Sequence, residues 1–408
     1  MKKSFHPLLA FLALMSTAFA CTLPFGTQQP SGDQVATIVA STLQAPTLVS
    51  SVGETPVPEA TGLLPHTFYY LGNDSTGLLQ VFRLEKDGKT VKQITFEPTG
   101  VGRYDVSLMD GSVAYVVNNQ LLLINADGSG RRVLVDGGPV DPNNRNENIL
   151  HHPVFSPDRQ TIAYAHNGLN LYNIATSVSK LVLGKRVIDP VSGGMMQDAF
   201  YRPEKYSPDG VKLLITIGIP YTDATHDAIY YPATNSVVGF NSADGSFFCC
   251  GKEEWTQDSL SFYAANPTVG MLSPGLWRVD AASGVVTTLL PTDASVGNVN
   301  LADEPYLAPD GQLYFFFATV SSPDGMIEQS PLQLVRSAPD GVTGRTVLRP
   351  EIFELLNEAL WAPDASFVIT AKAPTDTIYA GSVIELYYTD GSSMISLLPF
   401  GQQMKWGP

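Results

Sequence analysis

Between residues 66 and 408 the apolar positions fall in short runs that turn-forming residues separate. Runs such as Thr161–Tyr164 and Leu313–Phe316 are rich in β-branched and aromatic side chains, which favour strands. No sustained spacing of apolar residues by three and four positions competes with these runs, so helices are not indicated. The pattern therefore predicts an all-β domain.

One four-residue phrase ends a strand and opens a turn before many of these runs. Its clear copies end in Asp158, Asp209, Asp310 and Asp364, as in Phe155-Ser156-Pro157-Asp158, and weaker copies end in Asp110 and Asp258. Pro presets the backbone of the turn, and Asp accepts a hydrogen bond from the residue two positions on. Successive Asp positions are 48, 51, 49, 52 and 54 residues apart, which indicates a structural repeat.

Each repeat has room for four short strands, which we label a to d in chain order. The phrase joins a to b, a third strand follows, and a tight turn leads to the fourth. The third strands are expected at Leu169–Ile174, Leu332–Ser337 and Val383–Tyr388, and the last turns at Ala126–Ser129, Ala243–Ser246, Ala282–Gly284 and Thr389–Ser392. Four antiparallel strands in about fifty residues are typical of a propeller blade.

We expect seven blades. Thr67–Leu71, Leu79–Leu84 and Thr90–Phe96 supply three strands of the first blade, and no phrase precedes them. Met404–Pro408 looks like the opening of one more phrase, so we expect it to supply the missing inner strand and close the ring. The alternative is a frayed C-terminal tail.

Residues 66–408 resemble the bacterial TolB-type, WD40-like propeller repeats, because the blades of that family carry the same Ser-Pro-Asp-Gly turn. The resemblance implies the fold and leaves the activity open, because such propellers carry many functions. The Trp-Asp dipeptide of true WD repeats and the Ser-x-Asp-x-Gly-x-x-x-Trp box of sialidases are both missing.

The first twenty residues have the pattern of a signal peptide, with Lys2 and Lys3 before the apolar run Pro7–Phe19. Ala18–Cys21 resembles a lipobox, which implies cleavage before Cys21 and lipidation of that cysteine. The alternative is an ordinary secretory signal. Residues 21–65 then read as a tether rich in Pro, Ser and Thr, and 66–408 as the propeller domain. We expect a protein of the cell envelope, outside the cytoplasm, held on a membrane by its lipid alone.

Composition narrows the range of partners. The net charge is −15 and the pI is about 4.7, which argues against a nucleic-acid partner. The three cysteines are too few for a disulfide scaffold. We expect no cofactor and no metal, since no His-x-x-x-His or similar ligand spacing occurs. We also expect a monomer.

Strand order places the a–b and c–d turns on one face of the disc, the turn face, and the b–c and d–a connections on the other, the loop face. Long connections are expected on the loop face at 136–148, 183–200, 220–235, 266–274, 320–330 and 374–382. Long loops on a rigid scaffold are where binding usually occurs. Tyr221, Tyr230 and Tyr231 are the candidate anchors for a ligand.

Counting back from each phrase reaches residues at the mouth of the central channel. They are Asp105, His152, Glu204, Glu304 and Glu358, with Glu253 and Glu254 beside them. Such a ring could attract a cation or a basic peptide through its summed field. The alternative is a solvated acidic rim.

The leading hypothesis is a non-catalytic platform that binds a protein or a peptide. The alternative is a carbohydrate-active or other hydrolytic propeller that uses Glu204, Glu304 and Glu358 as acid and base. The sequence has no Gly-x-Ser-x-Gly elbow, which argues against a hydrolase of the prolyl-oligopeptidase type.

Overall fold

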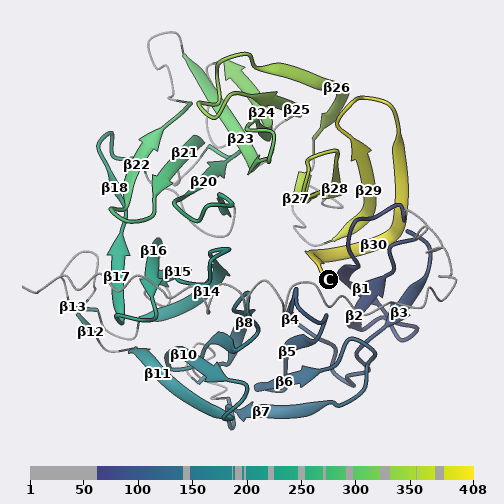
Figure 1. Ribbon diagram of the computed structural model, residues 1–408, viewed down its shortest axis with the longest axis vertical. Coiled ribbons are helices and arrows are strands. Elements are labelled where there is room, and N and C mark those ends of the chain that lie inside the picture. The colour runs from purple at the N-terminus through teal and green to yellow at the C-terminus, as the bar shows by residue number, and fades with distance from the viewer. Residues whose placement is uncertain are drawn as a thin grey trace, which may run out of the picture. The chain divides into compact units, whose positions relative to one another are not determined.

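The computed structural model describes residues 62–140, 148–185, 187–188, 195–196, 199–218, 225–246, 253–269, 273–290, 297–321, 331–354, 356–372 and 381–408. These residues all belong to one unit of the chain, Thr61–Pro408. Within them the secondary structure is entirely β, so the described part of the chain holds no helix able to span a bilayer. Figure 1 shows the sheets of this unit arranged in a ring, each with one strand toward the centre. This all-β arrangement confirms the predicted β-propeller.

Four of the sheets in the described residues contain four antiparallel strands in chain order. Their strands are β4 (Arg103–Val106), β5 (Val113–Val117), β6 (Gln120–Ile124) and β7 (Arg132–Asp136); β8 (His151–Phe155), β9 (Thr161–Ala165), β10 (Gly168–Asn173) and β11 (Val178–Gly184); β14 (Phe200–Tyr206), β15 (Leu213–Gly218), β16 (Thr225–Tyr231) and β17 (Ser236–Gly239); and β23 (Asn298–Leu307), β24 (Leu313–Ser321), β25 (Leu332–Ser337) and β26 (Thr346–Phe353).

A fifth sheet has an additional strand, because β18 (Asn241–Ser242) pairs in parallel with its outer strand β22. Its other members are β19 (Glu253–Trp255), β20 (Ser261–Asn266), β21 (Gly275–Asp280) and β22 (Val285–Thr288). A small hairpin joins β12 (Val187–Ile188) to β13 (Met195–Met196).

The last sheet contains both ends of the described chain. It runs in the order β27 (Leu356–Trp361), β28 (Phe367–Lys372), β29 (Ser382–Tyr388), β30 (Met394–Trp406), β1 (Phe68–Asn73), β2 (Leu79–Leu84) and β3 (Val91–Gln93). The first part of β30 pairs with β29, and its end pairs with β1, with Trp406 opposite Phe68. The C-terminal segment thus supplies the inner strand beside β1, as predicted. We interpret this sheet as two joined blades.

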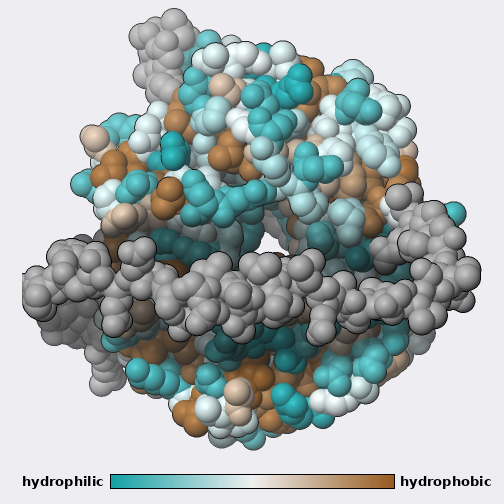
Figure 2. Space-filling view, in the orientation of Figure 1, coloured by the Kyte–Doolittle hydropathy of each residue, from teal (hydrophilic) through white to brown (hydrophobic). Residues whose placement is uncertain are grey.

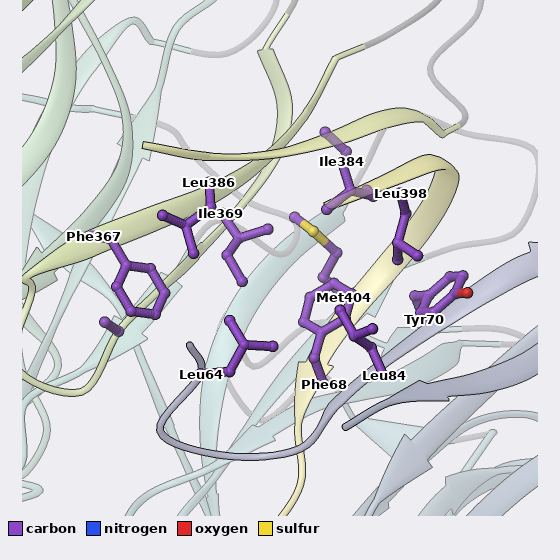
Figure 3. Packing of buried hydrophobic residues seen from close by; sticks show 12 residues of the cluster. Leu64, Phe68, Tyr70, Leu84, Phe367, Ile369, Ile384, Leu386, Leu398 and Met404 are labelled. Atoms are coloured by element: carbon purple, nitrogen blue, oxygen red, sulfur yellow. The ribbon is translucent and has the colours of Figure 1, made fainter. Parts of the chain in front are cut away.

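Buried side chains hold this junction together. Figure 3 shows Ile384 and Leu398 on one side of Met404, with Phe68 and Leu84 on the other. Phe68 and Leu84 are fully buried, and Met404 is 9% exposed. Comparable clusters occupy the space between other successive sheets, so the core consists of layers between blades.

The predicted phrase forms the same turn in successive sheets. In one copy, Asp158 Oδ1 accepts a hydrogen bond from the backbone N of Gln160 (3.0 Å). In the next copy, Asp209 Oδ1 accepts one from the N of Val211, also 3.0 Å away. The residue after the Asp has a positive φ in each copy, which explains why Gly is frequent there; these residues are Gly111, Arg159, Gly210, Ser259, Gly311 and Ala365.

The expected strand order is wrong in the β14–β17 sheet. Residues 220–235 were expected to form a long loop, but β16 occupies Thr225–Tyr231 and is the third strand. The turn expected between the third and fourth strands at Ala243–Ser246 therefore follows β18 instead. The sequence did not predict β16 because the strand begins with polar residues. One of them, Asp227, has a side chain that is buried against the sheet rather than exposed to solvent.

Long connections are not uniform on the loop face. β5 and β6 are joined by Asn118-Asn119, both with positive φ, as in a two-residue hairpin. β9 and β10 are joined just as tightly, through His166-Asn167. The expected segregation of loop length therefore fails in these two blades, and parts of the other long connections lie outside the described residues.

Candidate functional site

Half of the predicted acidic ring, Asp105, Glu254 and Glu358, connects neighbouring blades. Asp105, on β4, accepts a hydrogen bond from the backbone N of Phe155 in β8 (2.7 Å) and pairs with Lys405 of β30, also at 2.7 Å. Glu254 pairs with Lys205 in the same manner. These carboxylates are neutralised by partners in the next blade, so they do not form a free acidic rim.

Glu358 has a similar structural role. Its Oε1 accepts a hydrogen bond from the N of Gln403 (2.7 Å), and its Oε2 accepts one from the N of Met404 (3.0 Å). Both donors belong to the closing part of β30. This engagement argues against Glu358 as a catalytic acid or base.

β-Bulges disturb the inner strands where the predicted residues lie. The pairing register shifts between His151 and Val154 in β8, and between Asp303 and Tyr306 in β23. His152 and Glu304 have φ values of 51° and 48° at these bulges. Bulges redirect side chains, and positive φ in a residue other than glycine is costly unless the surroundings hold it. The predicted residues therefore do not share one orientation around the channel.

The bulge in β8 brings two consecutive histidines together. Nδ1 of His151 lies 2.6 Å from Nδ1 of His152, and the ring centroids are 4.7 Å apart. Burial, and then Arg202 and Arg103, lower the pKa of His151 to about 4; burial, then His151 and the same arginines, lower that of His152 to about 2. At neutral pH both imidazoles are uncharged.

Two arginines stand beside this pair. Arg103 lies on β4 and is exposed, and Arg202 lies on β14 and is half-buried with its guanidinium 4.8 Å from the centre of the Phe200 ring. Within the described part of the chain, neither guanidinium makes a hydrogen bond or ion pair with another side chain. We call Arg103, His151, His152 and Arg202 the Arg–His patch.

Three adjacent inner strands build this patch. β4 contacts β8, and β8 contacts β14. Figure 1 shows these three strands side by side at the inner rim, and Figure 2 shows hydrophilic residues around the central hollow. The patch lies where these strands begin, which is the loop face.

Glu204 adjoins the patch, is half-buried, and forms a carboxyl pair with the buried Asp227. The Thr216 hydroxyl oxygen lies 2.9 Å from Glu204 Oε1 and 2.8 Å from Asp227 Oδ1. One hydroxyl hydrogen cannot serve two carboxylates, so the arrangement favours one protonated carboxyl group. Burial, followed by the charge of Asp227, raises the pKa of Glu204 to about 7.

The tyrosine expectations need correction. Tyr230 is completely buried, and its hydroxyl donates to Asn235 Oδ1 at 2.8 Å. It is a core residue and cannot be a surface anchor. Tyr231 is half-buried, with its hydroxyl bonded to the carbonyl of Ala281 at 2.6 Å. Cys21 and Tyr221 lie outside the described residues, as do Cys249 and Cys250.

Sequence reasoning reached His152 and Glu204 but missed Arg103, His151 and Arg202. Counting back from the phrases also reaches these three residues, at the same distance before Asp110, Asp158 and Asp209. They were missed because only acidic residues and His152 were considered as candidates. No group of three or more His, Cys, Asp or Glu residues in the described ranges is placed to hold a metal ion.

Comparison with known proteins finds similarity in structure only. No family model matches the sequence, and no curated protein matches it. A prolyl endopeptidase structure has a TM-score of 0.51 at 15% identity, with 84% of this chain and 49% of that chain covered. A puromycin hydrolase structure has a TM-score of 0.51 at 13% identity, with 84% and 53% covered. The chain thus spans about half the length of these two proteins.

TolB from Acinetobacter baumannii is also among the similar structures, with a TM-score of 0.41, 14% identity, and 81% of this chain and 77% of that chain covered. At such identities the likeness concerns the fold and assigns no activity. The chain is a β-propeller protein.

Proposed function

We propose that the propeller is a non-catalytic platform that binds a protein or peptide on its loop face, with the Arg–His patch at the centre of the site. The observation that carries this proposal is the contrast within the inner rim. Asp105, Glu254 and Glu358 are engaged by neighbouring blades, whereas Arg103 and Arg202 have no such partner among the described residues.

Unpaired guanidinium groups suit recognition better than structure. Arg is enriched at interfaces and frequently dominates their energetics. The patch also sits on a rigid scaffold, since each inner strand is one edge of a paired sheet. Rigid placement lowers the entropy that a ligand must overcome on binding.

Crosslinking in intact cells, followed by mass spectrometry, tests this proposal. The double variant Arg103→Ala/Arg202→Ala is expected to lose the partners that the unmodified protein captures. The control is Asp127→Ala/Asp390→Ala, which alters c–d turns on the turn face. Capture that survives in the arginine variant and is lost in the control, with both variants folded, would contradict the proposed face.

We further propose that lipidated Cys21 anchors the protein to a membrane outside the cytoplasm. The support is the lipobox-like segment Ala18–Cys21. Each buried CH₂ of an acyl chain contributes about 0.8 kcal/mol, so stable attachment needs more than one chain.

Fractionation of cells checks the anchor. Cys21→Ser is expected to move the protein from the membrane fraction to the soluble fraction. Cys250→Ser controls for loss of a thiol as such. A Cys21→Ser protein that stays on membranes to the same extent as the unmodified protein would show that another feature holds it there.

A further inference from the structure

The sequence suggested an acidic rim that attracts cations. In the described part of the structure, however, two arginines of the inner rim lack an ion-pair partner, whereas Asp105 and Glu254 have one. Lys405 cancels Asp105, and Lys205 cancels Glu254. The net charge of the whole chain is −15, so two arginines at one point of the inner rim that find no ion-pair partner in the described ranges run against the general composition.

We propose that the Arg–His patch binds a carboxylate group of a peptide ligand, and that Glu204, which shares the Thr216 hydroxyl with Asp227, tunes the charge beside the patch. This inference rests on the function proposed above and names the chemistry of the partner. Arg103 and Arg202 supply the charge, and the neutral histidines supply polar contacts beside it.

Guanidinium geometry favours a carboxylate. The planar fork of Arg donates two parallel hydrogen bonds to the two oxygens of a carboxylate. Arg202 lies over the ring of Phe200, so one face of its guanidinium is covered while its N–H edge stays available. Arg103 is exposed on β4, on the other side of β8 from Arg202, and can approach the same group from there.

The charges around Glu204 explain why its protonation matters. Arg202 lies two residues before it on β14, Thr216 of β15 and Asp227 of β16 lie beside it, and Arg103 of β4 acts on it across the rim. The histidines of β8 are uncharged at neutral pH, since burial and the same arginines lower their pKa values. Ionised Glu204 would therefore compete directly with a ligand carboxylate for the arginines.

The expected pH dependence follows. A ligand carboxylate has an ordinary pKa near 4, so it is fully ionised above about pH 6. The lowered pKa values keep the histidines neutral over this range. Glu204, beside the patch, is the group that changes charge near pH 7. Affinity for carboxylates should fall as the pH rises from 6 to 8.

Fluorescence anisotropy with the full chain tests the inference. Three labelled peptides of equal length are compared: an acidic peptide with an amidated C-terminus, a neutral peptide with a free C-terminal carboxylate, and a basic amidated peptide. The first two distinguish side-chain carboxylates from a chain terminus. At least one should bind, and more tightly than the basic peptide, with affinity about fivefold lower at pH 8 than at pH 6.

Variants connect this binding to the patch. Arg103→Ala/Arg202→Ala should weaken it by about tenfold or more, whereas the charge-matched control Arg132→Ala/Lys180→Ala on exposed outer strands should not. Glu204→Gln should bind equally well at pH 6 and pH 8. Thermal melting of each variant verifies that it is folded.

Some results would overturn the inference. They are a preference for the basic peptide, carboxylate binding that is unchanged in the arginine variant, or no binding of any peptide. If partner capture in cells still depends on Arg103 and Arg202, such a result refutes the carboxylate and leaves the binding platform standing. If capture does not depend on them, the proposed function fails as well.

Discussion

A chain that ends at Gln402 is expected to melt about 10 °C lower than the full chain and to aggregate more readily. The deletion removes Met404 and Trp406 from the junction between β1 and β30. Trp406 contacts the rings of Phe68 and Phe367, with centroids 6.0 and 6.4 Å away, and donates from Nε1 to the carbonyl of Trp361 (2.7 Å). Truncating a packed Trp costs about 3–5 kcal/mol, and the deletion also exposes the edge of β1.

Differential scanning calorimetry measures this loss. Phe96→Ala is a suitable control, because it removes an aromatic side chain that is 74% exposed and should leave the melting temperature nearly unchanged. Trp406→Ala should give a smaller decrease than the truncation, since the backbone pairing remains. Equal melting temperatures for the truncated and full chains would show that the ring does not depend on this closure.

Glu97→Ala is expected to destabilise the fold by about 3 kcal/mol. Glu97 is 4% exposed and accepts hydrogen bonds from the Tyr115 hydroxyl (2.6 Å) and from Nε and Nη2 of Arg131 (2.7 and 3.0 Å). Its own backbone is fixed by the side chain of Gln80. Removing the carboxylate leaves the buried Tyr115 hydroxyl without its partner.

Chemical denaturation at two pH values checks the electrostatic part of this effect. Burial alone would raise the pKa of Glu97, but Arg131 and Tyr115 outweigh it, so the folded-state pKa lies below the ordinary value. The unfolded chain therefore binds the proton more readily, and this stability is present at neutral pH and is lost as the pH falls through the folded-state pKa. Glu97→Ala should cost more at pH 7 than at pH 3.

Two substitutions serve as controls for this experiment. Glu97→Gln should lie between the native protein and Glu97→Ala, because it keeps the shape and loses the charge. Glu354→Ala alters an exposed carboxylate and should have little effect. A free energy of unfolding that is equal for Glu97→Ala and Glu354→Ala would contradict the role of Glu97 as a link between blades.

The repeat made much of the fold predictable. Turn chemistry is local, so Pro157 and Asp158 specify their turn without help from distant residues. The closing strand was also visible, because Trp406 occupies the place of Trp361 in the preceding repeat. Local rules failed at β16, where Asp227 is buried and polar and the strand did not show the expected alternation.

The candidate site was less predictable, since its properties depend on contacts between blades. Asp105 meets Phe155, which is 50 residues away, and Lys405, at the other end of the chain. No pattern in the sequence shows that these partners neutralise it. The positive φ of His152, which accompanies the close approach of the two imidazoles, likewise leaves no pattern in the sequence.

The closure also fixes the face on which the preceding chain enters the propeller. The backbone N of Thr67 donates to the carbonyl of Pro408 (3.2 Å), so both ends of the domain meet on the turn face. A tether that enters there is attached opposite the beginnings of β4, β8 and β14. If Cys21 is the anchor as proposed, the attachment enters the domain on the face opposite Arg103 and Arg202 and leaves their face clear of its point of entry.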